Sequence, residues 1–310
     1  ETDNIPTANY ARFNNKADSI KYLKDQSLPI VIKADGLAAG KGVTVAETME
    51  IAEQAIIDIF NEKFGANMEV VIEEFMDGEE ASYFICADGE NFVSLESAQD
   101  HKRIGENDTG PNTGGMGAYS PAPILNSKIK QQVDNEIIIP TLKALQKSGN
   151  PYKGILYAGL MIKDDYAKLV EYNIRFGDPE CQVLMLRMKN DIVQLILDCI
   201  DGKLNKTQIE WEDDNCATVV MASKGYPGEY KKNTIIRGIE KLESSDIFQV
   251  FHAGTNHDGS NLLATGGRVL SVTAKNETLS EALNIIYKSI SQLEWPEGYY
   301  RKDIGKKALS

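Results

Sequence analysis

Leu169-Val170-Glu171-Tyr172-Asn173-Ile174-Arg175-Phe176-Gly177-Asp178-Pro179-Glu180 is the run that first indicates how this chain folds and what it binds. Side chains in a strand alternate between two faces, so we expect Glu171, Asn173 and Arg175 to point the same way. Carboxylate and amide oxygens suit magnesium, and the planar donor fork of arginine suits a phosphate or a carboxylate. The pattern indicates a metal-phosphate site; a surface ladder of polar residues on a half-buried strand is the alternative.

Length and composition set the broad class. The 310 residues exceed the usual size of one domain, and 42% hydrophobic with 25% charged residues excludes a disordered chain. No apolar run is long enough to span a bilayer, and no secretory signal is present. The net charge of -13 disfavours binding to nucleic acid or to anionic membranes. The four cysteines form no CxxC pair, which disfavours a zinc site or a disulfide framework and favours a cytoplasmic location.

Periodicity predicts a small α+β module in residues 1–78. The spacing of apolar residues predicts helices over 16–24 and 48–60 and strands over 29–33, 43–46 and 70–76. Residues 79–205 are predicted to form a second domain. Its expected strands are 81–87, 92–96, 158–162 and 168–173, and its expected helices are 127–148 and 179–200.

The segment 99–123 is rich in glycine and proline and is predicted to be a long structureless loop with a functional role. Residues 206–310 are predicted to form a C-terminal α+β domain. Strands are expected over 216–223, 248–252 and 268–274, followed by a helix over 278–292.

The glycine-rich loop 36–42 is not a P-loop, because only three residues separate Gly36 from Gly40 and a glycine follows Lys41. A strand rather than a helix follows it, so a dinucleotide fingerprint is also excluded. The loop could be a flap that places Lys41 over phosphates, or a tight hairpin turn. Lys33 ends a buried strand and needs an anion, such as a nucleotide phosphate, or access to water.

The acidic run Glu73-Glu74-Phe75-Met76-Asp77-Gly78-Glu79-Glu80 indicates a connector whose backbone could contact an adenine ring; an acidic strand end is the alternative. The three histidines have no evident serine or cysteine partner, so covalent catalysis by a triad is not expected. The chemistry indicated is electrostatic positioning of phosphates.

Together these features resemble the ATP-grasp superfamily. Four longer runs, 29–43, 99–103, 108–119 and 175–180, resemble the phosphoribosylamine-glycine ligase family, and the resemblance extends from about Ile5 to about Ile304. It implies an ATP-grasp fold, with a small ATP-binding lid module and a central mixed-sheet domain, followed by the C-terminal domain. The implied reaction joins glycine to 5-phosphoribosylamine through a glycyl phosphate, converts ATP to ADP and phosphate, and belongs to purine biosynthesis.

The resemblance also implies roles for individual residues. Glu171 and Asn173 would hold Mg²⁺ or Mn²⁺, while the preceding strand offers Ala158 where many relatives have a further acidic ligand. Arg175, Lys41 and Asp178 are the implied catalytic residues. The implied ATP contacts are Lys33, Gly40, Lys41, Gly42, Glu73, Glu74, Phe75 and Met76, with Glu80 on the ribose. The implied substrate contacts are Asp100, Lys102, Asn112, Thr113, Gly114, Gly115, Arg175, Asp178 and Glu180.

The family also has an N-terminal Rossmann-like domain, and we expect this chain to lack it. Two other functions are therefore kept as hypotheses: a nucleotide-binding module without turnover, and an ATP-grasp carboxylate-amine ligase that uses another amine. The expected partners are the small molecules ATP, glycine and 5-phosphoribosylamine, and no oligomeric state is predicted.

Overall fold

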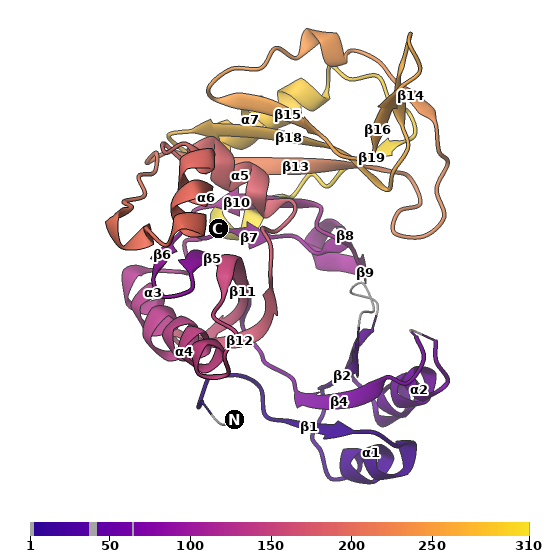
Figure 1. The fold of residues 1–310 in the computed structure, drawn as a ribbon. Helices are drawn as coiled ribbons and strands as arrows, with labels where there is room; N and C mark the ends of the chain where they lie inside the picture. The colour runs from indigo at the N-terminus through magenta and orange to yellow at the C-terminus, as the bar shows by residue number, and fades with distance from the viewer. Residues whose placement is uncertain (1–2, 37–41, 64, 310) are drawn as a thin grey trace. The chain divides into compact units, whose positions relative to one another are not determined.

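The computed structural model describes residues 3–36, 42–63 and 65–309, and the chain forms two compact units (Figure 1). Unit 1 comprises residues 1–5, 79–167 and 171–310, and unit 2 comprises residues 6–78 and 168–170. The domain limits 1–78, 79–205 and 206–310 remain a proposal. Among the described residues, no helix is both long and apolar enough to cross a membrane.

Unit 2 is an antiparallel four-stranded sheet with two helices packed against it. Helix α1 (Lys16–Leu23) begins after Asn15, whose side chain accepts a hydrogen bond from the Asp18 N–H, and α2 (Met49–Phe60) begins after Thr48 in the same way. Apolar residues of α2 and of the sheet pack together in one hydrophobic core. The sheet order is β1 (Tyr10–Phe13), β4 (Glu69–Glu74), β2 (Ile30–Asp35) and β3 (Val43–Ala46).

The first sheet of unit 1 has helices on both faces. Its central strand β5 (Glu79–Asp88) is buried from Ala81 onward, and its side chains alternate between the two faces. Tyr83 donates a hydrogen bond to Asp134 on one face, and Phe84 joins the core cluster on the other. The strand order is β12 (Tyr166–Asn173), β11 (Lys153–Lys163), β5 and β6 (Phe92–Ser94). The covering helical segments are α3 (Ser127–Val133), the π-helical turn Asp134–Ile138, α4 (Ile139–Lys147), α5 (Glu180–Arg187) and α6 (Ile192–Asp201). Helix α5 also packs against the second sheet of this unit.

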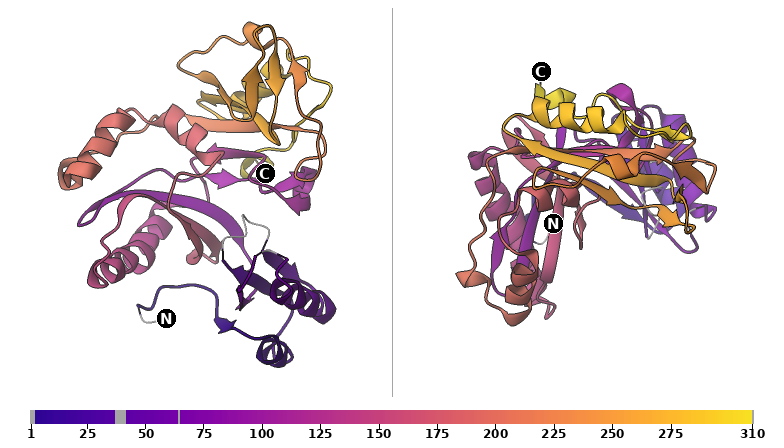
Figure 2. Two further views of the ribbon diagram at one scale, coloured as in Figure 1. Left: turned by 45° about the vertical axis from the view of Figure 1, so that its right-hand side comes forward. Right: turned by 90° about the horizontal axis from the view of Figure 1, so that it is seen from above.

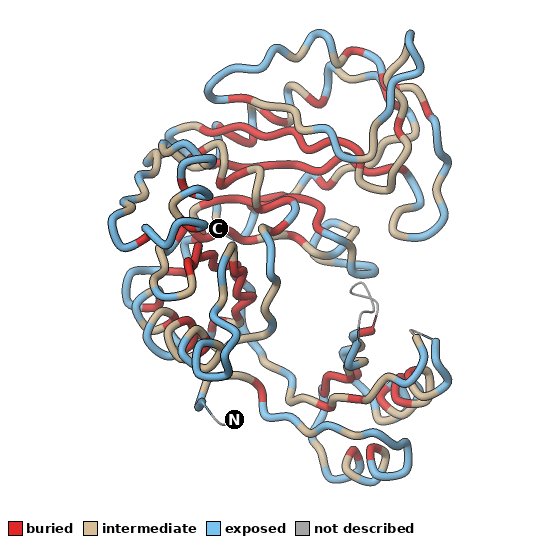
Figure 3. Tube along the Cα trace, in the orientation of Figure 1, coloured by how far each residue is buried: buried red, intermediate tan, exposed pale blue. Residues whose placement is uncertain are grey.

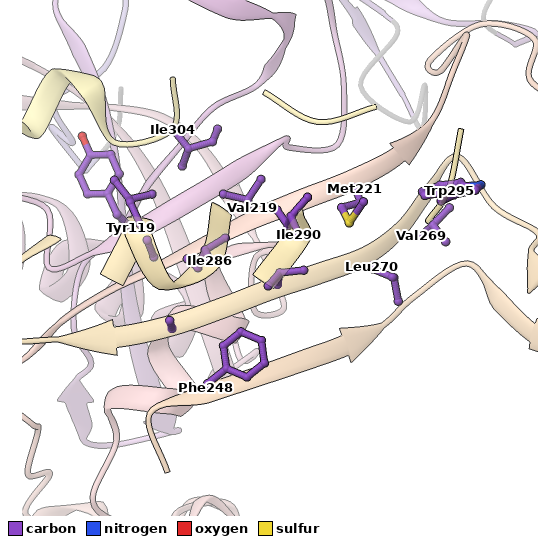
Figure 4. Packing of buried hydrophobic residues seen from close by; sticks show 14 of the residues in the cluster. Tyr119, Val219, Met221, Phe248, Val269, Leu270, Ile286, Ile290, Trp295 and Ile304 are labelled. Carbon is purple, nitrogen blue, oxygen red and sulfur yellow. The ribbon is translucent and has the colours of Figure 1, made fainter. Parts of the chain in front are cut away.

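The second sheet of unit 1 joins strands that are far apart in the sequence. Figure 2 shows α7 (Leu279–Ile290) lying along one face of this sheet, and Figure 3 shows the buried positions that follow its strands. Ile286 and Ile290 pack with Met221 and Val219 in its core (Figure 4). The strand order is β15 (Phe248–His252), β18 (Arg268–Asn276), β13 (Asn215–Ser223), β10 (Gly117–Ser120) and β7 (Gln99–Asp100), and β19 (Gly298–Tyr299) also pairs with β13.

Two predictions about these elements are wrong. The segment 99–123 is not structureless, because it contains β7, β10 and the hairpin of β8 (Arg103–Gly105) and β9 (Thr109–Asn112). The helix predicted over 179–200 is two helices. Met188 has extended backbone and bridges to Trp211, and Asp191 begins α6 by accepting a hydrogen bond from the Val193 N–H.

Unit 1 also contains shorter elements. A three-stranded antiparallel sheet follows β13, and a short helix lies near the C-terminus. These elements are β14 (Thr234–Ile236), β17 (Leu262–Ala264), β16 (Thr255–His257) and α8 (Lys306–Leu309).

Candidate functional site

The polar ladder at the end of β12 lies on one face, as the period of two predicts. Asn173 Nδ2 donates to Glu171 Oε1 over 3.3 Å, and one terminal nitrogen of Arg175 donates to Asn173 Oδ1 over 3.4 Å. Tyr172 points the other way, and its hydroxyl lies 2.5 Å from Thr141 Oγ1 of α4. Glu171 and Arg175 are exposed, so their heads are open to a ligand.

The donor set of this ladder fits a hard divalent cation. It offers the Glu171 carboxylate and the Asn173 amide oxygen, which are ligands that magnesium prefers. The residue facing Glu171 on β11 is Gly159, where a Cβ would lie 3.4 Å from Glu171 Cγ, while Ala158 is fully buried. No group of three or more His, Cys, Asp or Glu residues that could hold a metal occurs in the described ranges. These two residues would supply only part of a coordination shell, as in magnesium sites that keep several waters.

A cluster of ionisable groups lies in the same unit. Lys102 forms an ion pair with Glu80. Burial opposes the charge of Lys102, but the Asp100 and Glu80 carboxylates raise its pKa above the usual range, and Glu171 acts in the same direction. Burial raises the pKa of Asp100 to about 7; Lys102 opposes this effect, and Glu180 and Glu80 add to it. These groups share one electrostatic environment, so a charged ligand at one affects the others.

Glu180 is the buried carboxylate of this group. It is only 3% exposed at the first residue of α5, and Ser82 Oγ lies 3.1 Å from its Oε1 and 2.8 Å from the Tyr157 hydroxyl. Gly177 makes room for it, because a Cβ there would lie 2.3 Å from Glu180 Oε2. Glu180 is therefore held by its surroundings, and any contact with a substrate would come from a fixed position.

The turn 112–115 packs directly against residues 178–179. Thr113 Oγ1 donates to the Lys102 carbonyl over 2.8 Å and accepts from the Gly115 N–H over 3.0 Å. Gly115 has φ of +111°, and a Cβ there would lie 2.4 Å from Pro179 Cδ. The structure thus brings together three of the predicted substrate segments. Asn112 is exposed on β9, opposite Arg103.

Two side chains that the sequence did not suggest also reach this turn. One terminal nitrogen of Arg268 donates to the carbonyls of Asp178 (2.5 Å) and Gly114 (2.7 Å), and the other donates to Asp178 Oδ2 (2.9 Å). The Tyr226 hydroxyl accepts from the Gly114 N–H over 3.0 Å. No local pattern could have indicated these residues, because they act on segments 90 to 154 residues earlier in the chain.

The predicted nucleotide residues of unit 2 have protein partners. Lys33 Nζ lies 2.5 Å from Glu73 Oε2, and both side chains are about four-fifths buried. The carboxylate partner satisfies the requirement that a buried lysine has an anion. Glu74 accepts from Asn9 Nδ2 (2.8 Å) and Lys168 Nζ (3.0 Å); burial opposes the charge, but these donors lower its pKa.

The remaining predicted nucleotide contacts differ in exposure. Phe75 is exposed and Met76 is half-buried just after β4, and the exposed Glu80 is the second residue of β5 in unit 1. Gly42 is buried, and its carbonyl accepts from the Ala34 N–H over 2.8 Å. Gly40 and Lys41 lie outside the described residues, so the hairpin and flap alternatives for this loop both stay open.

Sequence comparisons identify relatives along the whole chain. Residues 1–181 match the family model "Phosphoribosylglycinamide synthetase, ATP-grasp (A) domain", and residues 216–307 match the corresponding C domain. A phosphoribosylamine-glycine ligase of Brucella melitensis is 51% identical over 307 residues, which are 99% of this chain and 72% of that protein. A chloroplastic phosphoribosylamine-glycine ligase of Arabidopsis thaliana is 51% identical over 99% of this chain and 59% of its own length.

Solved structures agree with these matches. The phosphoribosylamine-glycine ligase of Thermotoga maritima superposes with a TM-score of 0.89 at 34% identity, over 98% of this chain and 75% of that one. A biotin carboxylase domain from Hydrogenobacter thermophilus, solved with MgADP, has a TM-score of 0.74 at 15% identity, over 96% of this chain and 65% of that one. The second likeness bears on the fold alone. The predicted ATP-grasp fold is confirmed.

Proposed function

The chain belongs to the phosphoribosylamine-glycine ligase family, and from this premise we propose how its residues carry the reaction of that family. The predicted enzyme class, an ATP-dependent carboxylate-amine ligase of purine biosynthesis, is confirmed by relatives about 51% identical over 99% of the chain. The reaction forms glycyl phosphate and ADP from glycine and ATP. The amine nitrogen of 5-phosphoribosylamine then attacks the acyl carbon, phosphate leaves, and the nitrogen loses a proton. A cytoplasmic location is part of the proposal.

The observation that carries the residue assignment is the contact chain Glu171–Asn173–Arg175. We assign the metal to Glu171 and Asn173, because the Asn173 amide contacts the Glu171 carboxylate at an exposed strand end. A divalent cation bound there would neutralise phosphate charge. ATP use and a divalent metal follow from the family and fold, and Mg²⁺ is the ion we propose, with Mn²⁺ as the alternative.

Arg175 is assigned to the transferring phosphoryl group. Its guanidinium is exposed and is tethered at one end by the Phe176 carbonyl (2.8 Å) and at the other by Asn173. A donor fork held in this way can meet the charge that develops on the phosphoryl oxygens without a large rearrangement. Lys102 keeps its positive charge beside Glu80 and Asp100, and we assign it with them to substrate binding.

Residues 112–115, Asp178 and Glu180 are assigned to the substrates as well. The packing of Gly115 against Pro179 supports the assignment, because it holds a backbone turn beside the Asp178 carboxylate. A fixed turn and a fixed carboxylate can orient a small substrate and so lower the entropy lost when it reacts.

The ATP contacts proposed in unit 2 are Lys33, the loop that ends at Gly42, and residues 73–76. Lys33 already has Glu73 as partner, so a phosphate there would share or replace that ion pair. Exposed Phe75 offers apolar surface for an adenine ring. Lys41 and Gly40 are proposed to contact phosphates on the sequence argument alone, and Glu80 is proposed to contact the ribose.

The test is ADP release with magnesium, ATP and freshly generated phosphoribosylamine, with and without glycine. We expect glycine-dependent release from the protein and a loss of roughly 3 kcal/mol of transition-state stabilisation in Glu171→Ala, a decrease of over a hundredfold. Glu240→Ala, which removes an exposed carboxylate elsewhere, should retain activity. Near-normal turnover by Glu171→Ala would refute the metal assignment. ATP binding without glycine-dependent release would favour the nucleotide-binding module, and release with another amine would favour a different ligase.

A further inference from the structure

Arg268 joins two segments of the candidate substrate site. It is the first residue of β18, and its guanidinium contacts the Gly114 carbonyl, the Asp178 carbonyl and the Asp178 carboxylate. The side chain is only 21% exposed, so most of its charge is withdrawn from water. Its ion-pair partner among the described residues is Asp178. A contact of this kind is worth more than an exposed surface ion pair, because both the charge and the geometry are fixed.

Two glycines make this arrangement possible. A Cβ at Gly114 would lie 2.9 Å from the Arg268 Cζ, so a side chain there would push the guanidinium away. A Cβ at Gly267 would lie 2.3 Å from Cδ2 of Tyr226, whose hydroxyl accepts from the Gly114 N–H. Gly114 is therefore held through both its N–H and its carbonyl by side chains of the C-terminal region.

The Asp178 carboxylate is held from both sides and yet remains accessible. Arg268 binds Oδ2, and Gln182 Nε2 donates to Oδ1 over 3.1 Å. The Asp178 side chain is still 51% exposed. A fixed, half-exposed carboxylate is a poor partner for a phosphate but a good acceptor for a primary amine or an ammonium group.

We propose that Arg268, assisted by Tyr226, is a positioning residue for the amine-bearing substrates of the ligase. It acts through Asp178 and the Gly114–Gly115 turn, and it does not act on ATP. The inference rests on the proposed function, since it assigns the amino group of glycine or of phosphoribosylamine to the Asp178 carboxylate. It also gives the C-terminal region, matched separately by its own family model, a direct part in the chemistry of the ATP-grasp region.

The test compares Arg268→Met, Arg268→Lys and Tyr226→Phe with the control Arg237→Met, which removes an exposed arginine of the same region. We expect Arg268→Met to raise KM for glycine or phosphoribosylamine roughly tenfold or more, and to lower kcat, because a charge-assisted contact is lost. KM for ATP and the affinity for ADP should stay within about twofold of wild type. Lysine should restore part of the loss, and Tyr226→Phe should show a smaller change of the same kind.

A double-mutant cycle separates positioning from a general structural role. If Arg268 acts in part through the Asp178 carboxylate, then Arg268→Met should have a clearly smaller effect in an Asp178→Asn background than in wild type. Additive effects, equal changes in the KM for ATP and for glycine, or a lysine variant no better than methionine would each overturn the proposal.

Failure of the proposed function would look different, since the wild-type protein itself would then release no ADP in response to glycine. In that case glycine binding, titrated calorimetrically with ADP present, decides the question. Freshly generated phosphoribosylamine is titrated in the same way. Weaker binding of either compound by Arg268→Met than by Arg237→Met supports the proposal, and equal binding of both overturns it.

Discussion

Replacing Asp100 by asparagine should remove a pH-dependent loss of stability from unit 1. Burial raises the pKa of this carboxyl from 3.8 to about 7, so the folded protein keeps a proton that the unfolded chain releases. Because the unfolded state binds fewer protons than the folded state between pH 4 and 7, the free energy of unfolding falls as pH rises through this window. At about 1.4 kcal/mol per pKa unit, the upper limit is about 4 kcal/mol. Asp100 is half-buried and lies near Lys102, so we expect about 2 kcal/mol between pH 5 and 8.

The assay uses the position of the two tryptophans. Trp211 and Trp295 both lie in unit 1, so their fluorescence during urea unfolding reports that unit alone. The measurement is made at several pH values without divalent metal or nucleotide. Wild type should lose stability from pH 5 to 8, while Asp100→Asn should lose about 2 kcal/mol less. Asp246→Asn controls for the change in net charge, since Asp246 is exposed. Parallel pH profiles for wild type and Asp100→Asn would refute the reasoning.

Three further results are expected. Arg301→Met should lower the free energy of unfolding by about 3–5 kcal/mol in the same fluorescence assay, because Arg301 is 1% exposed and forms ion pairs with both Asp108 and Asp303. Asp108 would keep its ion pair with Lys307, while Asp303 would lose its pair with Arg301. A cost below about 1 kcal/mol would contradict this. Ile286→Ala should cost about 2–5 kcal/mol, since Ile286 is a fully buried residue of α7 that packs into the core of the second sheet. A variant as stable as wild type would show that the core closes around the gap. Burial and the nearby Arg301 lower the pKa of His101 to about 4, so its ring proton resonances should stay constant from pH 8 to 5.5. Because the unfolded chain takes up the proton first, the free energy of unfolding should fall only as pH drops from 6.5 toward 4. A titration midpoint near 6.5 by NMR would contradict this prediction.

The elements predicted well are those with a strong local signal. The strand 43–46 and the helices at 16–24 and 48–60 have clear apolar spacing, and α1 and α2 also have polar N-caps. The strand over Gly117–Ser120 was missed because only four residues form it, and three of them are small, so no alternation of apolar and polar residues shows. It exists because β13 and β7 pair with its two edges, and both partners are distant in the sequence or too short to recognise.

The helix predicted over 179–200 shows the same limit. The helical spacing of apolar residues continues through residues 188–191. There, however, Met188 forms a β-bridge to Trp211 and the Lys189 N–H donates to the Glu210 carbonyl, so these backbone groups are not available for helical hydrogen bonds. A tertiary partner outweighed the local preference.

In the candidate site, period-two alternation placed Glu171, Asn173 and Arg175 on one face, and their mutual contacts confirm that geometry. Their roles stay predictions. The contacts of Arg268 with Asp178 and Gly114 could not be predicted, since nothing in one sequence connects it to residues 90 and 154 positions away.

The second sheet of unit 1 has consequences for how such a gene can be divided or recombined. Its strands come from residues 99–120 and from residues 215–299, and β10 covers one edge of β13 over four residues. A gene fragment encoding only 206–310 would leave that edge of β13 with unpaired N–H and C=O groups, which invite pairing with other chains. An exchange of the C-terminal region between relatives would therefore have to preserve the pairing with the short strand Gly117–Ser120. The two regions depend on each other through this backbone pairing, and not only through the linker that joins them.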